Sequence, residues 1–590
     1  MCIFFKIWAC TGGHARSETP CGHGPPSRVG QERPSRSGLG SMAISAMLSV
    51  MTTTSRSDVI VQLFQWRFAD IAIECCQHLG PRGFAAVQLS PVTEQRQGNA
   101  WYFAYQPVSY AVGNRLGDEA AFISMCAECA RCGVDVLVDA VVNHMAEGSG
   151  SGTAGTTFGS RTFESLYQPL DFHHAISDSS TNCQVDDYSS TLNVQQCDLL
   201  GLPDLRTEDA GVRTKISDFL RHLHSLGVSG VRVDAAKHMP AADVGTLLSG
   251  TFSYDNVVQE VIEDASAPAA LNPTAYVANG RVTEFSYAWI VAQHFTASTL
   301  TQLLTLTGPP SGTFGRLPSA QAVVFIDNHD TQRHDDDRLT HEDGELYLAA
   351  NAFMLAWPYG RPRVMSSYNL SLDSLSGVLA GPPFATAVHD PASPGVVNCG
   401  AGMAWLCEHR SPMVTNMVAW RASAGDAPIE HWQTGSSAGQ VAFSRNASAF
   451  IAFSMPPGSR WAATLQTGLP PGIYCQIAVD GCTVYVTVAA DGTAVIDVGA
   501  DGVSVLALHV LAFAPPPLSP SLPPVLPALA PPLTEGSSSG ADIGMIIGLI
   551  AGGLVLLGVA AALLFRMRVK ACGRLAKVEP APAWPDAEPS

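Results

Sequence analysis

Three acidic side chains close short apolar runs of the kind that form buried β-strands. Because the parallel strands of a closed barrel bring their C-terminal ends to one edge, such residues would meet there. Three converging carboxylates suit glycoside hydrolysis, in which one attacks the sugar, one protonates the leaving oxygen, and the third helps to distort and hold the ring. The alternative is three unrelated loop carboxylates. The residues are Asp234 after Gly230–Val233, Glu260 at the end of Val257–Glu260, and Asp330 at the end of Phe325–Asp330.

Arg232 and Asp234 are two residues apart, so a strand would project both side chains from the same face. His238 follows at a distance where a turn could return it to the same pocket. A structural ion pair between Arg232 and Asp234 explains this segment equally well. Apolar residues flank Glu260, and such surroundings raise a carboxyl pKa, as a proton donor requires.

The secondary-structure elements that must position the three carboxylates lie between Val59 and Tyr368. Strand-like runs and longer helical stretches follow one another, which predicts an α/β fold built on a (β/α)₈ TIM barrel. A helix is predicted before Gly230, where apolar residues from Val212 to Leu226 recur at helical spacing. The predicted strands are Val59–Phe64, Ala85–Leu89, Val134–Val138, Gly230–Val233, Val257–Glu260, Val282–Phe285, Val323–Ile326 and Arg363–Met365.

Two further regions depart from this alternation. A stretch of about sixty residues rich in Gly, Ser, Thr and Asp follows the third strand, and a structureless loop of that length is unusual, so a small inserted domain is expected. After about residue 425, short strands with turn signals predict a C-terminal antiparallel β-sandwich. The predicted division is a leader at 1–57, barrel parts at 58–144 and 205–425, the inserted domain at 145–204, the sandwich at 426–513, a Pro/Ser/Gly-rich stalk at 514–542, a transmembrane helix at 543–565 and a cytoplasmic tail at 566–590.

Residues 543–565 are uncharged and apolar, a run long enough to cross a bilayer, and Arg566, Arg568 and Lys570 follow it. We therefore expect a single-pass membrane protein, anchored by one C-terminal helix, with an extracellular or lumenal catalytic domain. A buried core helix is the alternative. The formal net charge of −18 argues against a nucleic-acid partner. We expect the ectodomain to be monomeric.

Cysteine spacing agrees with an oxidising compartment. Three pairs are close enough in sequence for local disulfides, whereas zinc binding would need CxxC pairs with matching spacing. Cys126, Cys129 and Cys132 are expected along one helix. The three pairs are Cys183 with Cys197, Cys399 with Cys407, and Cys475 with Cys482.

Over residues 59–509 the sequence resembles the animal-type, chloride-dependent α-amylases of the α-amylase glycoside hydrolase family. The resemblance implies a retaining α-amylase that cleaves internal α-1,4 bonds of starch, glycogen and related glucans. A transglycosylase or maltodextrin hydrolase of the same family, or an inactive membrane-anchored barrel that binds carbohydrate or a transporter, are the alternatives. The resemblance rests on Gly83–Pro91, Tyr105–Tyr110, Val138–Met145, Gly230–His238, Gln259–Ile262, Gly280–Phe285, Asp327–Asp330, Pro358–Gly360, Arg363–Tyr368, Cys407–Arg410 and Leu465–Pro470.

The same resemblance implies a role for individual residues. Asp234 would be the nucleophile, Glu260 the general acid/base and Asp330 the transition-state stabiliser. The expected substrate-binding residues are Trp101, Tyr102, Tyr105, Gln106, His144, Arg232, Lys237 and His329.

Two ions are also implied by the resemblance. Calcium would take side-chain oxygens from Asn143 and Asp204 and main-chain carbonyls from Gln195 and His238, a hard-oxygen set that suits this ion. Chloride would be held by Arg232, Asn328 and Arg363. An anion there would offset the arginines, which otherwise lower the pKa of Glu260, so chloride activation is expected.

Three departures from the family pattern stand out. The interval from Asp234 to Glu260 is shorter than in relatives, so a loop at the acceptor side is trimmed. Charged residues at 331–338 replace a Gly-rich loop after Asp330. The resemblance places the disulfide partner of Cys75 at Gly113, so that disulfide is expected to be absent.

Overall fold

The computed structural model describes residues 56–513 apart from 165, 175–182, 308–316, 335–337, 370–380, 394 and 401. Eight parallel strands form a closed barrel in the order β1-β13-β12-β11-β10-β9-β6-β2. The predicted TIM barrel is thereby confirmed. Its strands are β1 (Ile60–Leu63), β2 (Ala86–Leu89), β6 (Asp135–Ala140), β9 (Gly230–Val233), β10 (Val257–Gln259), β11 (Arg281–Thr283), β12 (Ala322–Val324) and β13 (Arg361–Ser366).

The barrel strands are short, apolar and buried along nearly their whole length. Such continuous apolar runs are typical of parallel strands, because helices cover the outer face while side chains fill the interior. Five buried side chains, one each from five of the barrel strands, form a cluster of their own. The cluster consists of Ile60, Ala86, Leu137, Val258 and Val323.

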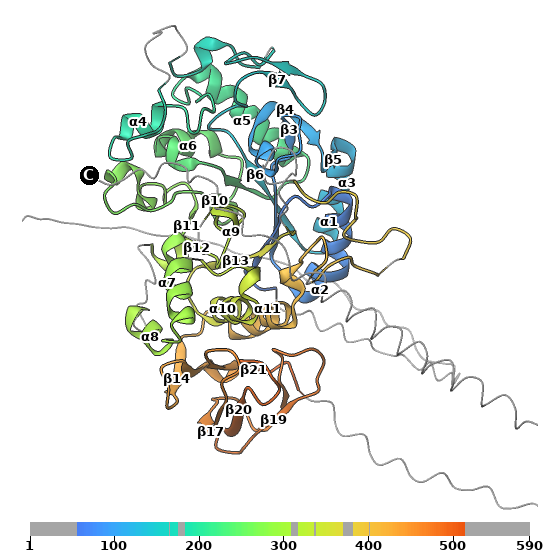
Figure 1. Ribbon diagram of the computed structural model, residues 1–590, viewed down its shortest axis with the longest axis vertical. Helices are drawn as coiled ribbons and strands as arrows, with labels where there is room; N and C mark the ends of the chain where they lie inside the picture. Colours follow the sequence, from blue (N-terminus) through green and yellow to red (C-terminus); the bar gives the residue numbers. More distant parts are fainter. Residues whose placement is uncertain are drawn as a thin grey trace, which may run out of the picture. The chain divides into compact units, whose positions relative to one another are not determined.

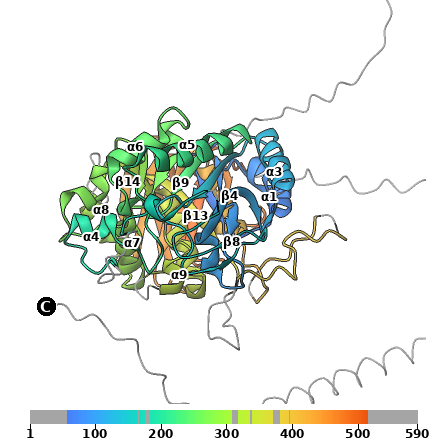
Figure 2. The ribbon, with the colours of Figure 1, turned by 90° about the horizontal axis from the view of Figure 1, so that it is seen from above.

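Helices surround the strands, as the view along the barrel shows (Figure 2). The predicted stripe before Gly230 forms α5 (Ala210–Ser225), and Asp209 caps it by accepting hydrogen bonds from the main-chain N–H groups of Gly211 and Val212. The other α-helices here are α1 (Phe68–Glu74), α2 (Gly80–Arg82), α3 (Glu119–Arg131), α6 (Ala241–Leu248), α7 (Phe285–Thr296), α8 (Thr301–Thr307), α9 (Thr331–His334), α10 (Glu345–Ala356) and α11 (Pro412–Ala424).

Two excursions extend the barrel at the end where its strands terminate. The first carries β3 (Thr93–Gln95), the 3₁₀ turn η2 (Trp101–Tyr105), β4 (Pro107–Asn114) and β5 (Gly117–Asp118). The second is the long insertion after β6, with β7 (Gly150–Ser151), β8 (Thr157–Phe158) and α4 (Thr191–Gln196). Main-chain hydrogen bonds from Met145 to Pro203 (3.2 Å) and from Leu205 to Asn143 (2.9 Å) join its two ends. The insertion therefore leaves and re-enters the barrel at one point.

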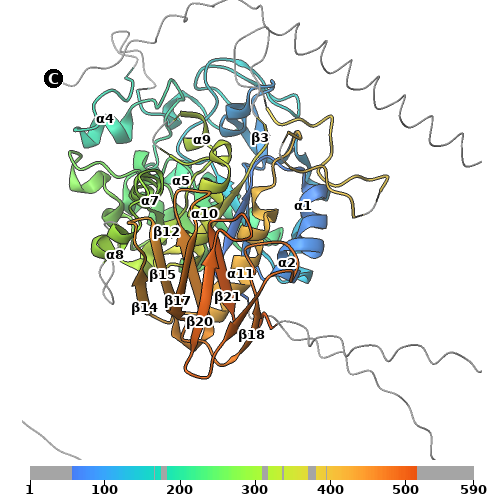
Figure 3. The same cartoon turned by 60° about the horizontal axis from the view of Figure 1, so that its bottom comes forward.

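The C-terminal region forms two four-stranded antiparallel sheets at the opposite end of the barrel from α4 and β7 (Figures 1 and 3). Apolar side chains of both sheets pack together in one cluster. β14, an exposed edge strand, and β18, which begins with glycine, show no apolar alternation that would predict them from the sequence. The sheets are β14 (Ile429–Thr434), β15 (Gln440–Arg445), β16 (Ala449–Ser454) and β21 (Val505–His509), and β17 (Trp461–Gln466), β20 (Thr493–Val498), β19 (Tyr485–Val488) and β18 (Gly472–Cys475).

The structure contains the three predicted local disulfides, 183–197, 399–407 and 475–482. It also contains two disulfides that were not predicted. Cys75, whose family partner position is Gly113, is bonded to Cys129 instead, and the adjacent Cys76 is bonded to Cys132. Cys129 lies one turn before the C-terminal cap of α3, so both thiols at this end of the helix face the segment after α1. Cys126 is buried and unbonded.

The predicted membrane localisation is corrected. Crossing a bilayer takes about twenty consecutive apolar residues in a helix. Among the described residues no helix meets that requirement, and the longest, α5, is amphipathic. The stretch predicted to cross the membrane, 543–565, lies outside the described residues, as do the stalk, the tail and nearly all of the leader.

Candidate active site

A pocket of about 470 Å³ opens where β9, β10 and β12 end. The three predicted catalytic carboxylates all line it, although they come from three separate segments of the chain. Six of the predicted substrate-binding residues line it as well, namely Trp101, Tyr102, Tyr105, Gln106, His144 and His329. Ala235 and four residues of the insertion, Glu147, Leu199, Leu200 and Leu202, complete the wall. The barrel and its insertion therefore build the pocket together.

Arg232 joins the carboxylates beneath this pocket. Its Nη1 lies 2.5 Å from Asp234 Oδ1 and 2.6 Å from Asp139 Oδ1, and its Nη2 lies 2.6 Å from Glu260 Oε1. The Arg232 side chain is 2% exposed, so these ion pairs are shielded from water. One cation thus holds three carboxylates in a fixed arrangement.

Burial and mutual repulsion shape the charge of this cluster. Burial raises the pKa of Asp234 well above its usual value; Arg232 opposes that effect, and the Glu260 and Asp139 carboxylates add to it. The pKa of Asp330 is raised to about 7, chiefly by burial and then by the Glu260 charge. The Asp330 side chain is nevertheless 42% exposed, because it lies in the pocket wall rather than in the interior. Carboxylates with raised pKa values in a cleft are typical of catalytic sites.

Glu260 is oriented on both of its oxygens. Oε1 pairs with Arg232, and Oε2 accepts a hydrogen bond of 2.9 Å from the main-chain N–H of Ala235. Ala235 has a left-handed backbone, with φ of 47°, directly after Asp234. This turn places the donor for Glu260 beside the Asp234 carboxylate, so the two acids are positioned as a pair.

Aromatic rings and imidazoles form the wall of the pocket. The His329 ring stacks between Phe64 and Tyr105, with ring centroids 5.0 and 4.8 Å away. His144 Nε2 lies 3.0 Å from the Tyr105 carbonyl oxygen. Burial lowers the pKa of His144 to about 4, so this imidazole is neutral near pH 7. Flat, fixed rings of this kind offer stacking faces to a sugar.

Lys237 is placed apart from the pocket lining. Its Nζ lies 5.0 Å from the ring centroid of Tyr188 and donates a hydrogen bond of 3.1 Å to the Ile262 carbonyl. Both contacts lie on the side of the site bordered by the insertion and by the segment after Glu260.

Two of the predicted calcium ligands carry a buried side-chain oxygen that no donor of the described residues contacts. Asn143 Oδ1 and Asp204 Oδ1 are buried and lack a hydrogen-bond partner among the described residues. Burial raises the pKa of Asp204 to about 7, and His173, whose Nδ1 lies 2.6 Å from Asp204 Oδ2, opposes that effect. His238 Nδ1 lies 2.9 Å from the Val194 carbonyl, so the segments carrying residues 195 and 238 adjoin. Orphaned hard oxygens fit a calcium ion.

The two arginines among the predicted chloride ligands carry buried N–H donors that lack an acceptor within the described part of the chain. Arg232 Nε and Arg363 Nε are buried N–H donors without an acceptor among the described residues. Burial, followed by the charge of Arg232, lowers the pKa of Arg363 to about 10. Asn328 Oδ1 accepts hydrogen bonds from the main-chain N–H groups of Asp330 (2.9 Å) and Thr331 (2.8 Å). Unsatisfied guanidinium donors fit an anion.

Asp139, to which the sequence pattern assigned no role, is the third carboxylate bound to Arg232. Besides Arg232, it accepts a hydrogen bond of 2.9 Å from the Tyr105 hydroxyl through Oδ2. Its position near the end of β6 is the same signal that identified the other strand-end carboxylates. Arg333, which follows Asp330, was also overlooked.

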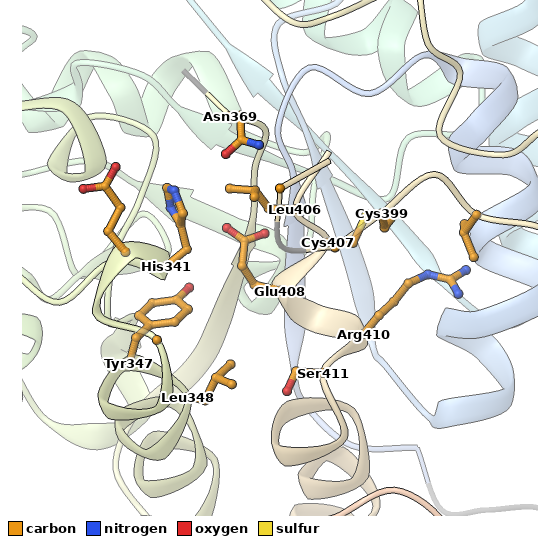
Figure 4. A pocket seen from close by; sticks show the side chains of 15 residues that line it. His341, Tyr347, Leu348, Asn369, Cys399, Leu406, Cys407, Glu408, Arg410 and Ser411 are labelled. Atoms are coloured by element: carbon orange, nitrogen blue, oxygen red, sulfur yellow. A yellow bond between two sulfur atoms is a disulfide. The ribbon is translucent and has the colours of Figure 1, made fainter. Parts of the chain in front are cut away.

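A second cavity, of about 700 Å³, lies next to the 327–330 loop and shares no lining residue with the first. The Glu408 carboxylate, the Tyr347 ring and the His341 imidazole face it (Figure 4). The Tyr347 hydroxyl donates 2.9 Å to Asp327 Oδ1, and Gln332 Nε2 donates 2.6 Å to Oδ2. Burial and the Glu408 charge raise the pKa of Asp327 to about 8. This cavity adjoins the support of the loop that carries Asp330.

The chain is similar in sequence to known α-amylases. Residues 73–289 match the catalytic domain of the α-amylase family. The chain is 39% identical over 456 residues to an α-amylase of Streptomyces violaceus, covering 77% of this chain and 74% of that protein. It is 37% identical to pancreatic α-amylase 2a5 of Mus musculus, covering 75% of this chain and 92% of the relative.

The fold is also similar to that of solved α-amylase structures. The crystal structure of α-amylase I from Eisenia fetida superposes with a TM-score of 0.69 at 34% identity, covering 78% of this chain and 98% of that one. A variant of the Eisenia enzyme, solved in complex with maltohexaose, gives a TM-score of 0.68.

Proposed function

The chain belongs to the α-amylase family of glycoside hydrolases, and from this premise we propose that it cleaves internal α-1,4-glucosidic bonds of starch, glycogen and related glucans with retention of configuration. The supporting observation is the Arg232 cluster, in which one buried cation holds Asp234 and Glu260 side by side under a pocket walled by aromatic rings.

In this proposal the reaction has two balanced steps. The Asp234 carboxylate attacks the anomeric carbon while Glu260 gives its proton to the glycosidic oxygen, so a glycosyl–enzyme ester forms as the glycosidic bond breaks. Glu260 then takes a proton from water, whose oxygen displaces Asp234 from the same carbon. Arg232 stabilises the Asp234 carboxylate before attack and after release. Asp330 faces the sugar and stabilises its positive charge in the transition state.

The aromatic wall supports the choice of substrate. Trp101, Tyr102 and Tyr105 offer ring faces, and Gln106, His144 and His329 offer polar atoms to glucose hydroxyls. Lys237 is proposed to act outside the pocket, on the acceptor side. We propose that the chain acts as a monomer and that its division into barrel, insertion and sandwich follows the boundaries 145–204 and 426–513.

The test is hydrolysis of starch and of maltooligosaccharides by the purified chain, with Asp234→Asn as the matched control. The parent should produce internal cuts early in the reaction, and the variant should lose activity by at least three orders of magnitude, because it lacks the nucleophile. A folded parent without activity on either substrate would overturn the proposal. Transfer of glucosyl units to sugars in preference to water would favour the transglycosylase alternative.

Asn143 and Asp204, with the carbonyls of Gln195 and His238, are proposed to hold calcium. The ion would supply positive charge to the two orphaned oxygens and join the insertion to the barrel. Removal of calcium by a chelator should lower the Tm and calcium, but not magnesium, should restore it. An unchanged Tm would contradict this site.

Arg232, Asn328 and Arg363 are proposed to hold chloride. An anion would supply the acceptor that the two Nε groups lack and offset the positive charge beside Glu260. Chloride should therefore raise kcat at neutral pH, and Arg363→Gln should weaken that response. Equal rates in chloride-free and chloride-containing buffer would exclude activation.

A further inference from the structure

Arg333 is a partly buried cation whose neighbours are aromatic rings. Its guanidinium carbon lies 4.9 Å from the ring centroid of Phe64, 5.0 Å from that of Trp101 and 5.6 Å from that of Tyr368. Its Nε and Nη2 have no hydrogen-bond acceptor among the described residues. Ring faces attract a guanidinium through their quadrupole, so the three rings help to hold this cation, whose charged form Tyr368 and Asp330 also favour.

The cage formed by Phe64, Trp101 and Tyr368 joins parts of the chain that lie far apart in sequence. Phe64 follows β1, Trp101 begins η2, and Tyr368 follows β13, while Arg333 itself lies in α9. Phe64 and Tyr368 stack on each other with centroids 5.9 Å apart. The guanidinium therefore fastens three separate segments at one point.

This point lies directly behind the active site. Arg333 does not line the pocket, but Trp101 does. Arg333 Nη1 also donates a hydrogen bond to the carbonyl oxygen of His329, the residue before Asp330. The Phe64 ring that contacts Arg333 stacks on the His329 imidazole as well. The Arg333 guanidinium thus contacts the Trp101 ring and the main chain at His329, next to Asp330.

We propose that Arg333 is a positioning residue for hydrolysis, which holds Trp101 as a platform for a glucose ring and fixes the main chain at His329, and through it the Asp330 carboxylate. The proposal rests on the function proposed above for this pocket. It makes Arg333 a determinant of substrate binding as well as of turnover, although it does not touch substrate.

Two substitutions separate the charge of Arg333 from its shape. Arg333→Met removes the charge and the planar group at similar length, whereas Arg333→Lys keeps the charge and one donor but cannot stack as a plane. With maltooligosaccharides, Arg333→Met should raise KM about ten-fold, because the loss of one desolvated cation–π contact changes an equilibrium constant by about that factor. It should also lower kcat. Arg333→Lys should recover kcat more than KM.

Arg338→Met is the matched control. Arg338 lies in the same charged stretch and is also placed over an aromatic ring, 5.5 Å from the centroid of Trp289. Trp289 is 46% exposed and does not line the pocket. This variant should keep the KM and kcat of the parent.

A residue needed only for stability would lower the active fraction and hence kcat, with KM unchanged. An unchanged KM in folded Arg333→Met would therefore overturn the proposal, as would an equal rise of KM in Arg338→Met. If Arg333→Met does not fold, Arg333→Lys provides the test. The proposal then expects Arg333→Lys to raise KM several-fold, and a KM of Arg333→Lys equal to that of the parent overturns it. A parent inactive on starch would instead overturn the function itself.

Discussion

At the scale of single residues, the site depends on one arginine that serves three acids. Arg232 contacts Asp139, Asp234 and Glu260 at 2.5–2.6 Å, so removing any one acid changes the charge and geometry felt by the other two. Asp139 is the member of this group that does not face the pocket. A substitution of Asp139 therefore tests whether the whole cluster, rather than Asp234 and Glu260 alone, sets the rate of the proposed reaction.

Asp139→Asn should lower kcat about a hundred-fold with a smaller change in KM. The amide keeps the shape but loses the ion pair to Arg232 and weakens the hydrogen bond from the Tyr105 hydroxyl, so Asp234 and Glu260 are misplaced. Initial rates on maltooligosaccharides measure both constants. The control is Asp135→Asn on the same strand, whose carboxylate pairs with Arg56 at the outer end. A parental kcat in Asp139→Asn would refute a role for the cluster.

At the scale of elements, α10 and the 327–330 loop are joined by a buried carboxyl group. Asp327 receives hydrogen bonds from Tyr347 on α10 and from Gln332 on α9, and its side chain is 1% exposed. Because its pKa is raised in the folded state, its protonated form is the one that folding favours. Its contribution to stability is fully present below the ordinary aspartate pKa and is lost as pH rises through about 8.

Asp327→Asn should therefore change the pH dependence of stability. The amide cannot ionise, so the Tm of the parent relative to that of the variant should fall between pH 5 and pH 8.5. Thermal denaturation across this range measures the difference. Glu342→Gln, which replaces an exposed carboxylate of the second cavity, controls for general charge effects. A constant difference in Tm would show that Asp327 does not titrate there.

Two disulfides join the segment after α1 to the end of α3. Disulfides Cys75–Cys129 and Cys76–Cys132 close nearly the same loop, with sequence separations of 54 and 56. A loop of that size is worth about 4 kcal/mol in the chain-entropy account, but once one bridge closes it the other adds little.

Removing either bridge with paired Cys→Ser substitutions should thus lower the free energy of unfolding by about 1 kcal/mol. Removing both should cost about 4 kcal/mol. Denaturant unfolding of the two double variants and the quadruple variant measures the three values. Additive losses would contradict the shared-loop explanation.

At the scale of the whole molecule, a buried arginine of the C-terminal sheets fastens them to the barrel. Arg445 on β15 donates hydrogen bonds to the carbonyls of Ala356 (2.8 Å) and Gly425 (2.6 Å), at the C-terminal ends of α10 and α11. Cations at helix C-termini are favourable, because the final carbonyls lack partners within the helix. Trp420 of α11 adds a hydrogen bond of 3.1 Å to Phe450 on β16.

Arg445→Met should therefore lower the free energy of unfolding by about 3 kcal/mol, since it leaves buried carbonyls unsatisfied. Activity per folded molecule should stay that of the parent, because the contact lies at the barrel end away from the pocket. Arg460→Met, which removes an exposed ion pair with Asp497, is the control and should cost far less. A loss of kcat in folded Arg445→Met would imply coupling between the sheets and the site.

The sequence by itself determined the barrel, its strands and the three carboxylates, because these depend on local patterns: apolar runs of strand length, and acids that close them. It also determined the family, through motifs that are each a few residues long. Only the tertiary structure decided which side chains meet across the barrel. The pairing of Arg232 with Asp139, of Cys75 with Cys129, and of Arg333 with Phe64, Trp101 and Tyr368 joins segments separated by tens to hundreds of residues. Such contacts exist only once the ring of strands has closed, so no local pattern records them.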